Sequence, residues 1–199
     1  MRIGVFGGTF DPPHFGHISL VCSMIEKLQL DRVYIIPSQI NPLKQTTKTK
    51  SDIRLKMTKL AFQDIPKTTV LDCELKRSGL SYTVDTLHWL MDNDKEFRQA
   101  TRFLLVGDDL VPDLGSWKSP DELFSLAQLV VARRGVDEVF STYTIQKIDS
   151  PIIDISSTEI RERLKKRLYC GHLVPHATLA LIEELHVYTN AEENLPGNS

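Results

Sequence analysis

Residues 3–37 read IGVFGGTFDPPHFGHISLVCSMIEKLQLDRVYIIP, and their pattern is the strongest indication of the fold class. A short apolar run at residues 3–6 ends at two glycines, and a second apolar run covers residues 33–36. Between the two runs, apolar residues recur every three or four positions, at Ile18, Val21, Ile25 and Leu28. That spacing is typical of an amphipathic helix. A strand, a helix and a second strand in close succession predict a βαβ unit, and therefore a parallel sheet.

The same alternation continues through the rest of the chain. Further strands are predicted at residues 69–75, 103–106, 129–132 and 152–155. Helices are predicted from Ser51, over residues 81–91, from Pro120, over residues 158–168 and over residues 175–185. We therefore expect an α/β protein with a mostly parallel sheet and helices on both faces. Residues 1–188 would form a single domain, and residues 189–199 a polar C-terminal tail.

The 199 residues carry nearly balanced charges, with 24 Lys and Arg against 26 Asp and Glu. The net charge of -2 argues against a nucleic-acid-binding protein, because such proteins usually present a strongly basic surface. The cysteines form no C-x-x-C pair, so neither a zinc site nor a disulfide framework is expected. No apolar run reaches the roughly 20 residues that span a bilayer. We expect a cytoplasmic protein that binds neither nucleic acid nor membranes.

The segment that follows the first predicted strand, GGTFDPPHFGH at residues 7–17, carries the clearest chemical signal. It contains neither the G-x-G-x-x-G dinucleotide fingerprint nor the G-K-[ST] of a P-loop. Its two glycines let the backbone approach a ligand closely. His14 and His17 lie three residues apart at a helix entry, where they would face the same side, and Gly16 would keep the space between them open. Two imidazoles beside the N-H groups of a helix start suit a reacting phosphate.

A second cluster, ISSTEIR at residues 155–161, again opens a helix after an apolar run. Its hydroxyl groups and backbone N-H groups would form a cradle for an anion, and Arg161 would add a forked cationic contact. Taken alone, the spacing of Ser156 and Glu159 equally fits an ordinary capping box with a surface arginine. The histidine cluster favours the first interpretation, because both anion sites would then lie at carboxyl ends of strands.

The runs GGTFDPPHFGH and ISSTEIR resemble the nucleotidyltransferase superfamily that is marked by an H-x-G-H signature. The middle of the chain is similar, more closely, to the bacterial nicotinate-nucleotide adenylyltransferases. This similarity rests on ELKR (74–77), SYT (81–83), DTL (85–87), GDD (107–109), WK (117–118), Arg133 before Gly135, and LVP (173–175). The resemblance runs in order through nearly the whole chain. It implies a Rossmann-like nucleotidyltransferase fold.

The activity implied by this resemblance is the transfer of AMP from ATP to nicotinate mononucleotide, which yields nicotinate adenine dinucleotide and pyrophosphate. The residues implied to contact ATP are Gly8, Thr9, Phe10, His14, His17, Arg133, Ser156, Ser157 and Arg161. His14, His17, Lys44 and Arg161 would be the catalytic residues. Mg²⁺ would arrive with ATP, held mainly by the phosphates, so no protein metal site is expected.

The residues implied to bind the mononucleotide are Thr83, Asp109, Trp117 and Lys118. Trp117 would stack on the pyridine ring. The alternative is a core or surface tryptophan, and the loop-like setting of Gly115, Ser116 and Lys118 favours stacking. One departure from the family is the loop Asn41-Pro42-Leu43-Lys44, where the family often has Pro-Pro-His-Lys. The resemblance therefore does not imply, at Leu43, the contact that the family's histidine makes with the acceptor.

Two other classes of function remain open at the level of the sequence. One is another H-x-G-H transferase, such as a phosphopantetheine adenylyltransferase, and the other is a non-catalytic nucleotide-binding module. The motif at residues 81–83 and Trp117 speak against the first, and the intact histidine and Ser/Arg clusters speak against the second. The sequence is compatible with a homo-oligomer but does not determine the oligomeric state.

Overall fold

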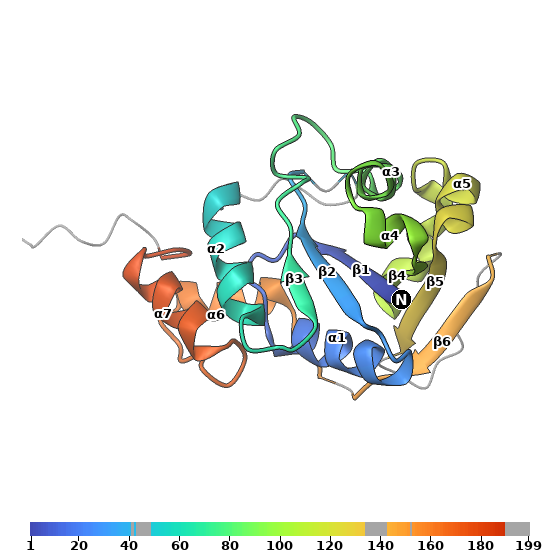
Figure 1. Ribbon diagram of the computed structural model, residues 1–199. Coiled ribbons are helices and arrows are strands. Elements are labelled where there is room, and N and C mark those ends of the chain that lie inside the picture. The colour runs from blue at the N-terminus through green and yellow to red at the C-terminus, as the bar shows by residue number, and fades with distance from the viewer. Residues whose placement is uncertain (41, 43–48, 134–142, 152, 190–199) are drawn as a thin grey trace, which may run out of the picture.

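The computed structural model describes residues 1–40, 42, 49–133, 143–151 and 153–189. Within these residues, six parallel strands form one sheet in the order β3-β2-β1-β4-β5-β6 (Figure 1). The strands are β1 (Arg2–Gly8), β2 (Arg32–Pro37), β3 (Thr68–Val70), β4 (Thr101–Gly107), β5 (Gln128–Arg133) and β6 (Ile145–Asp149). Every pairing between these strands is parallel, as the βαβ pattern predicted. This strand order is that of a Rossmann-type sheet.

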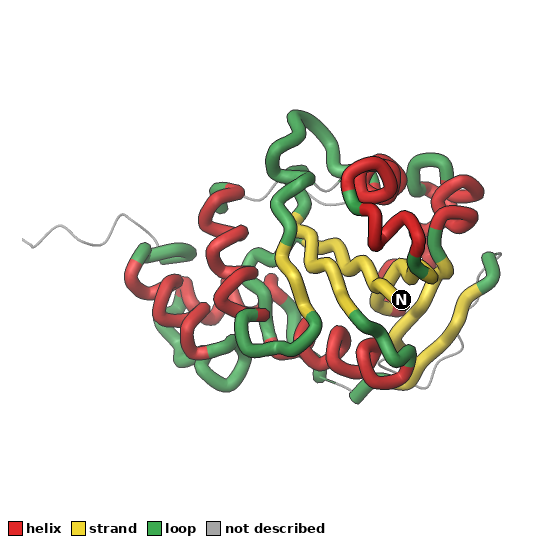
Figure 2. Tube along the Cα trace, viewed as in Figure 1, coloured by secondary structure: helices red, strands yellow, loops and turns green. Residues whose placement is uncertain are grey.

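Helices cover both faces of the sheet, which confirms the predicted fold class (Figure 2). The helices are α1 (Phe15–Lys27), α2 (Ser51–Phe62), α3 (Thr83–Asn93), α4 (Lys95–Gln99), the 3-10 helix η1 (Asp108–Ser116), α5 (Pro120–Leu126), α6 (Ser157–Lys165) and α7 (His176–Glu184). Pro120 occupies the first position of α5, where its missing N-H group costs nothing. The first strand, α1 and β2 form the βαβ unit that residues 3–37 predicted.

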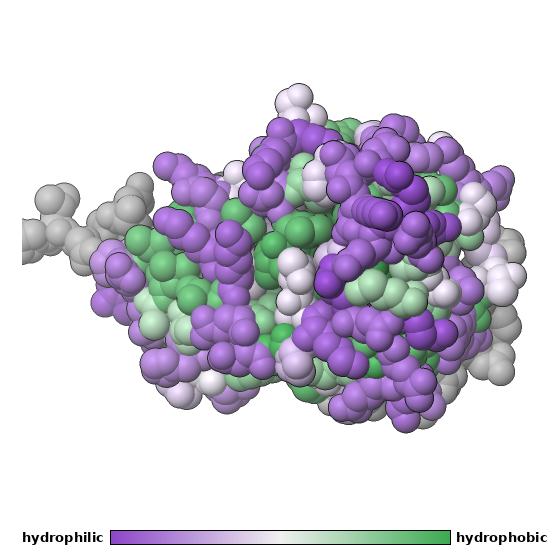
Figure 3. Space-filling model, in the orientation of Figure 1, coloured by the Kyte–Doolittle hydropathy of each residue, from purple (hydrophilic) through white to green (hydrophobic). Residues whose placement is uncertain are grey.

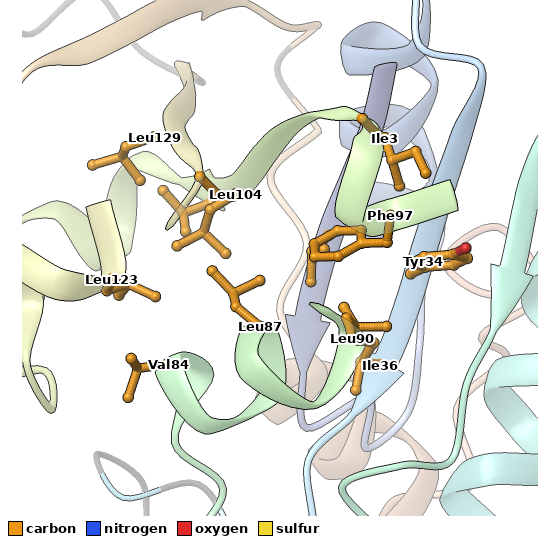
Figure 4. Packing of buried hydrophobic residues seen from close by; sticks show 14 of the residues in the cluster. Ile3, Tyr34, Ile36, Val84, Leu87, Leu90, Phe97, Leu104, Leu123 and Leu129 are labelled. Carbon is orange, nitrogen blue, oxygen red and sulfur yellow. The ribbon is translucent and has the colours of Figure 1, made fainter. Parts of the chain in front are cut away.

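The alternation of side chains along the strands builds two cores, one on each face of the sheet. In β4, Leu104 and Val106 pack with α3, α4 and α5, where Leu87, Leu90 and Phe97 point toward the strands (Figure 4). The neighbouring residues of the same strand, Phe103 and Leu105, belong to the opposite core, together with residues of α1. Burial on both faces explains why the central strands read as continuous apolar runs.

A third apolar cluster lies outside the two sheet cores and joins the C-terminal helices to α2. Its members include Met57 of α2, Ile160 and Leu164 of α6, and Leu179 and Ile182 of α7. In Figure 1, α2, α6 and α7 gather at one end of the molecule, beyond the β3 edge of the sheet. This cluster fixes where the ISSTEIR segment and the end of the described chain lie.

One predicted strand is wrong. Residues 153–155 are loop, the last strand is β6, and residue 152 lies outside the described residues. The apolar run does pack, but Ile155 turns toward the third cluster instead of pairing with the sheet. The predicted strand at residues 69–75 is also shorter, since β3 ends at Val70. An apolar run records burial, and burial against helices gives the same signal as burial in a sheet.

Polar residues cover most of the helices on the face drawn in Figure 3, and apolar residues gather near its middle. Within the described residues, no helix combines the length and the apolar character needed to cross a membrane.

Candidate active site

The order of the strands reverses beside β1, because β2 lies on one side of it and β4 on the other. Ligands of such sheets bind in the crevice at the carboxyl ends of the strands at this point. The chain leaves β1 there through Gly8, whose carbonyl oxygen accepts a hydrogen bond of 2.9 Å from the amide of Ser38, just after β2. A Cβ atom on Gly8 would lie 2.9 Å from the ring of Phe10, so a larger residue here would require that buried ring to shift.

The two imidazoles of the H-x-G-H motif stack at the start of α1. His14 is the N-cap residue and His17 is the third helical residue, and their ring centroids lie 3.7 Å apart. The backbone N-H of His14 donates to Nδ1 of His17 at 3.2 Å. Because Nδ1 accepts, the neutral imidazole of His17 carries its proton on Nε2. His17 can therefore offer an N-H donor from its far side to an anion.

Gly16 leaves room for this stack. A Cβ atom at this position would lie 3.0 Å from Cε1 and Nδ1 of His14 and 3.6 Å from the carbonyl oxygen of Ile153. His14 is only 4% exposed, so its ring has little space into which it could retreat. The prediction was that Gly16 keeps the space between the two histidines open, and the structure shows that a side chain at this position would crowd His14.

Replacing Gly16 by alanine is expected to lower kcat about tenfold or more, because the added methyl group displaces the imidazole of His14. The free energy of unfolding should change little, since alanine gains about 1 kcal/mol of helix propensity that offsets the crowding. Steady-state kinetics and urea unfolding of the same preparation measure the two quantities. A Gly16→Ala protein with unchanged kcat would show that the position of His14 is not critical.

The ISSTEIR segment lies against the H-x-G-H loop, although the two are far apart in the sequence. The Ser157 hydroxyl donates to the carbonyl oxygen of Pro12 at 2.9 Å, and Nη1 of Arg161 donates to that of Asp11 at 2.8 Å. The Ser156 hydroxyl caps α6 by accepting from the amide of Glu159 at 3.1 Å. The N-cap at Ser156 and the placement at the site are thus both present. Arg161 has five N-H groups, so it can hold the loop and still reach an anion.

Arg54 was not identified from the sequence, yet it holds two loops of the site. It is only 1% exposed on α2; Nη1 donates to the carbonyl oxygen of Thr9 at 2.8 Å, and Nη2 donates to that of Gln39 at 3.2 Å. Burial lowers its pKa, and the nearby Asp11 and Tyr188 partly oppose that shift. The available signal was its spacing, because residue 54 shares a helix face with the buried Met57.

A cavity of about 110 Å³ opens at the carboxyl ends of β1 and β2 and reaches the end of η1. Gly7, Gly8 and Ser38 line it at the carboxyl ends of β1 and β2, and Trp117 lines it at the other side. Ser38 Oγ and Trp117 Nε1 are buried and have no hydrogen-bond partner among the described residues. Buried polar groups normally have partners, so these two atoms point to a polar ligand or ordered water.

Three of the four predicted acceptor residues line this cavity. Thr83 begins α3, Trp117 follows η1, and Lys118 donates to both carboxylate oxygens of Asp85 at 2.8 and 2.9 Å. Asp109 is exposed on η1 and is absent from the cavity lining. The geometry therefore brings together Thr83, Trp117 and Lys118 and leaves Asp109 outside the group.

A buried acid that sequence reasoning missed supports the same cavity. Glu74 lines it and is 6% exposed, and its carboxylate accepts from the Thr86 hydroxyl at 2.6 Å. Burial raises the pKa of Glu74, while hydrogen bonds from Thr86 and Ser81 and the charge of Arg77 lower it in part. The ELKR and SYT motifs are thus joined in one network at the cavity wall.

The remaining predicted residues differ in how far the structure describes them. Phe10 has φ 51° and a buried ring, with its centroid 5.1 Å from that of His17, so only its backbone is available to a ligand. Thr9 Oγ1 is buried and lacks a partner among the described residues. Arg133 ends β5, but its side chain lies outside the described part of the chain, as does all of Lys44. The roles given to these residues stay predictions.

Comparison with known proteins agrees with this geometry. Residues 5–163 match the family model described as Cytidylyltransferase-like. The nicotinate-nucleotide adenylyltransferase of Bacillus subtilis is 36% identical over 188 residues, covering 94% of this chain and 98% of that protein. The chain belongs to the nicotinate-nucleotide adenylyltransferase family. The resemblance drawn from the motifs is thereby confirmed.

Solved structures confirm the Rossmann-like nucleotidyltransferase fold expected for this family. Plasmodium falciparum nicotinic acid mononucleotide adenylyltransferase complexed with APC has a TM-score of 0.77 and 19% identity, covering 94% of this chain and 96% of that chain. Its complex with NaAD has a TM-score of 0.75 and 20% identity, covering 94% and 97% of the two chains. The strand order and the helices on both faces are therefore those of a family member.

Proposed function

We propose that this protein transfers AMP from ATP to nicotinate mononucleotide and releases pyrophosphate. The observation that carries the proposal is the cavity that runs from Gly7 and Gly8, just before the H-x-G-H loop, to Trp117, in a chain of this family. Its loop end lies beside groups that suit phosphates, and its far end has a flat aromatic wall. The residues supply imidazoles, guanidinium groups and helix N-termini, which position and neutralise phosphates, and no activated serine or cysteine is required.

ATP would lie with its phosphates between the start of α1 and the start of α6. The hydrogen bonds of Ser157 and Arg161 to the loop bring these two helix N-termini together. A helix N-terminus favours negative charge, so the region between these two helix starts suits the phosphates. We assign the β- and γ-phosphates to Ser156, Ser157 and Arg161, and the α-phosphate to His17.

In the proposed reaction, an oxygen of the mononucleotide phosphate attacks the α-phosphorus of ATP in line. The bond from that phosphorus to the oxygen bridging to the β-phosphate breaks, and pyrophosphate leaves with the electron pair. No covalent enzyme intermediate is needed. The Nε2-H of His17 would donate to an α-phosphate oxygen whose charge rises in the transition state. Arg161 would stabilise the charge that develops on the leaving pyrophosphate.

The donor set of the site fits Mg²⁺ only as a companion of ATP. Mg²⁺ prefers oxygen ligands, whereas the groups that face the loop are imidazoles, a guanidinium group and hydroxyls, which suit phosphate oxygens. Ser156, Ser157 and Arg161 would hold the phosphates that carry the ion. When bound, the ion would neutralise phosphate charge.

The acceptor would occupy the cavity with its pyridine ring near Trp117.

We further propose that residues 1–188 act as one domain, with the third apolar cluster fastening the C-terminal helices to α2. The proposal also includes a cytoplasmic location, where ATP is available to a biosynthetic enzyme. A homo-oligomer is compatible with this scheme, and none of the assigned contacts requires one.

The test of this function is pyrophosphate release by the purified protein with ATP and Mg²⁺. Nicotinate mononucleotide, its nicotinamide analogue and phosphopantetheine are offered in parallel. We expect turnover with nicotinate mononucleotide and none with phosphopantetheine. Turnover with phosphopantetheine alone would assign the chain to a different H-x-G-H reaction. If neither nicotinate mononucleotide nor its nicotinamide analogue is turned over, the proposal is refuted.

Replacing Trp117 by alanine is expected to raise the KM for nicotinate mononucleotide by about ten- to a hundredfold, because an aromatic stacking surface of about 1–3 kcal/mol is lost. The affinity for ATP should stay within about twofold, since Trp117 lies at the cavity wall away from the loop. Calorimetric titration with ATP and acceptor kinetics separate the two effects. The exposed Trp89 on α3 provides a control, and Trp89→Ala should leave both constants unchanged. If only the affinity for ATP changed, Trp117 would contact ATP and not the nicotinate mononucleotide.

A further inference from the structure

Within the described residues, four hydrogen bonds join the C-terminal part of the chain to the site loop at residues 11–15. Three of them end on backbone atoms: those from Ser157 and Arg161, and the 3.0 Å bond from the amide of Phe15 to the carbonyl oxygen of Leu173. The fourth joins two side chains, because the Tyr188 hydroxyl donates to Oδ1 of Asp11 at 2.5 Å. The bond from Tyr188 is the one that comes from the far end of the described chain, after α7.

The segment after α7 holds Tyr188 in a defined place. The amide of Val187 donates to the carbonyl oxygen of Ile182 at 3.0 Å, which closes the turn that leaves the helix. Tyr188 itself has φ 73°, a conformation that is unfavourable for a bulky side chain. Its ring packs on the third apolar cluster, and its hydroxyl also lies 3.9 Å from Sδ of Met57. A backbone conformation of this kind persists only where the surroundings impose it.

The partner of this hydroxyl is a buried carboxyl group. Asp11 is 6% exposed, and a buried carboxylate is stabilised only by hydrogen-bond donors and nearby positive charge. Burial and the negative charge of Asp11 both raise the pKa of Tyr188, so the phenol keeps its proton and acts as the donor. Arg54 interacts with the charge of Asp11, and it also donates to the carbonyl oxygen of Thr9 in the same loop.

We propose that Tyr188 is a positioning residue for nucleotidyl transfer. Its hydroxyl fixes Asp11, and Asp11 belongs to the short loop that connects β1 to the histidine pair at the start of α1. An error of about 1 Å in the placement of a reacting group costs about a hundredfold in rate, so a side chain that holds this loop acts on the chemical step. This inference rests on the proposed function, because it assumes that the loop binds the phosphates of ATP.

The test removes one atom, the hydroxyl oxygen, in Tyr188→Phe. We expect kcat to fall about ten- to a hundredfold, which is the usual effect of losing a hydrogen bond to a charged group. The dissociation constant for ATP, measured by calorimetry without acceptor, should rise about fivefold or more. The KM for nicotinate mononucleotide should stay within about twofold, since Tyr188 is absent from the lining of the cavity.

A matched control is Tyr169→Phe, because Tyr169 is 73% exposed and lies in the loop after α6. That variant should have wild-type kinetics. The double variant Tyr188→Phe with Asp11→Asn should lose little more than Asp11→Asn alone, since both changes act on one hydrogen bond. Additive losses, or a lower melting temperature with unchanged kcat and ATP affinity at 20 °C, would overturn the inference. If the wild-type protein has no turnover, the proposed function fails, and the comparison of ATP affinities still decides the role of Tyr188.

Discussion

Replacing His17 by alanine is expected to lower kcat by about three orders of magnitude, or roughly 4 kcal/mol of transition-state stabilisation. The physical reason is the fixed tautomer of this imidazole. The His14 backbone N-H donates to its Nδ1, so the proton stays on Nε2, where it can meet the charge that develops on the α-phosphate. Alanine removes that donor at the position where the charge rises most.

The folding stability should change much less than the rate. His17 is partly exposed near the start of α1, and alanine is a strong helix former, so we expect a change of about 1 kcal/mol or less in the free energy of unfolding. Pyrophosphate release and urea unfolding measure the two quantities on one preparation. The exposed His176 at the start of α7 is the control, and His176→Ala should retain wild-type kcat. A His17→Ala protein with near-normal turnover would remove this histidine from the mechanism.

Replacing Arg54 by methionine is expected to cost about 3 kcal/mol of stability and to lower kcat/KM for ATP about a hundredfold. Methionine keeps most of the buried side-chain volume but leaves the carbonyl oxygens of Thr9 and Gln39 without their donor. Both carbonyl groups belong to loops that face the site, so the loss of stability and the loss of activity have the same cause. The stability and the kcat/KM of Arg54→Lys should lie between those of the wild-type protein and Arg54→Met. One ammonium group there replaces a guanidinium group that bonds two carbonyl oxygens.

Arg98 offers a matched control on the surface. It also donates to two backbone carbonyl oxygens, those of Met91 and Asp92, but it is exposed on α4. In Arg98→Met, water can replace the lost donors, so we expect a loss of less than about 1 kcal/mol and unchanged kinetics. Urea unfolding and ATP-dependent kinetics of the two variants test the comparison. Equal losses in the two variants would show that burial of Arg54 does not set its effect.

The sequence was sufficient where function depends on short-range order. The paired imidazoles at the start of α1 and the cap of α6 at Ser156 depend on residues within one turn of each other, and each strand and helix of the βαβ unit depends on the pattern within that element. Spacing alone decides such contacts, because backbone geometry fixes where neighbouring side chains point. The strand predicted over residues 152–155 failed for the opposite reason, since tertiary packing decides which partner an apolar run finds.

The amino-acid pattern was enough to predict an α/β protein of the H-x-G-H type and the motifs that carry its chemistry. How those motifs meet depends on contacts that form only in the folded chain. Arg54 in α2 and Tyr188 after α7 both hold the loop between β1 and α1. Neither residue lies in a sequence motif that would predict this contact. Neither residue is recognisable from the sequence, because the partners of Arg54 are backbone carbonyl groups and the partner of Tyr188 is a carboxylate far away in the chain. Their function comes from burial, which makes each hydrogen bond costly to lose, and burial is a property of the folded chain.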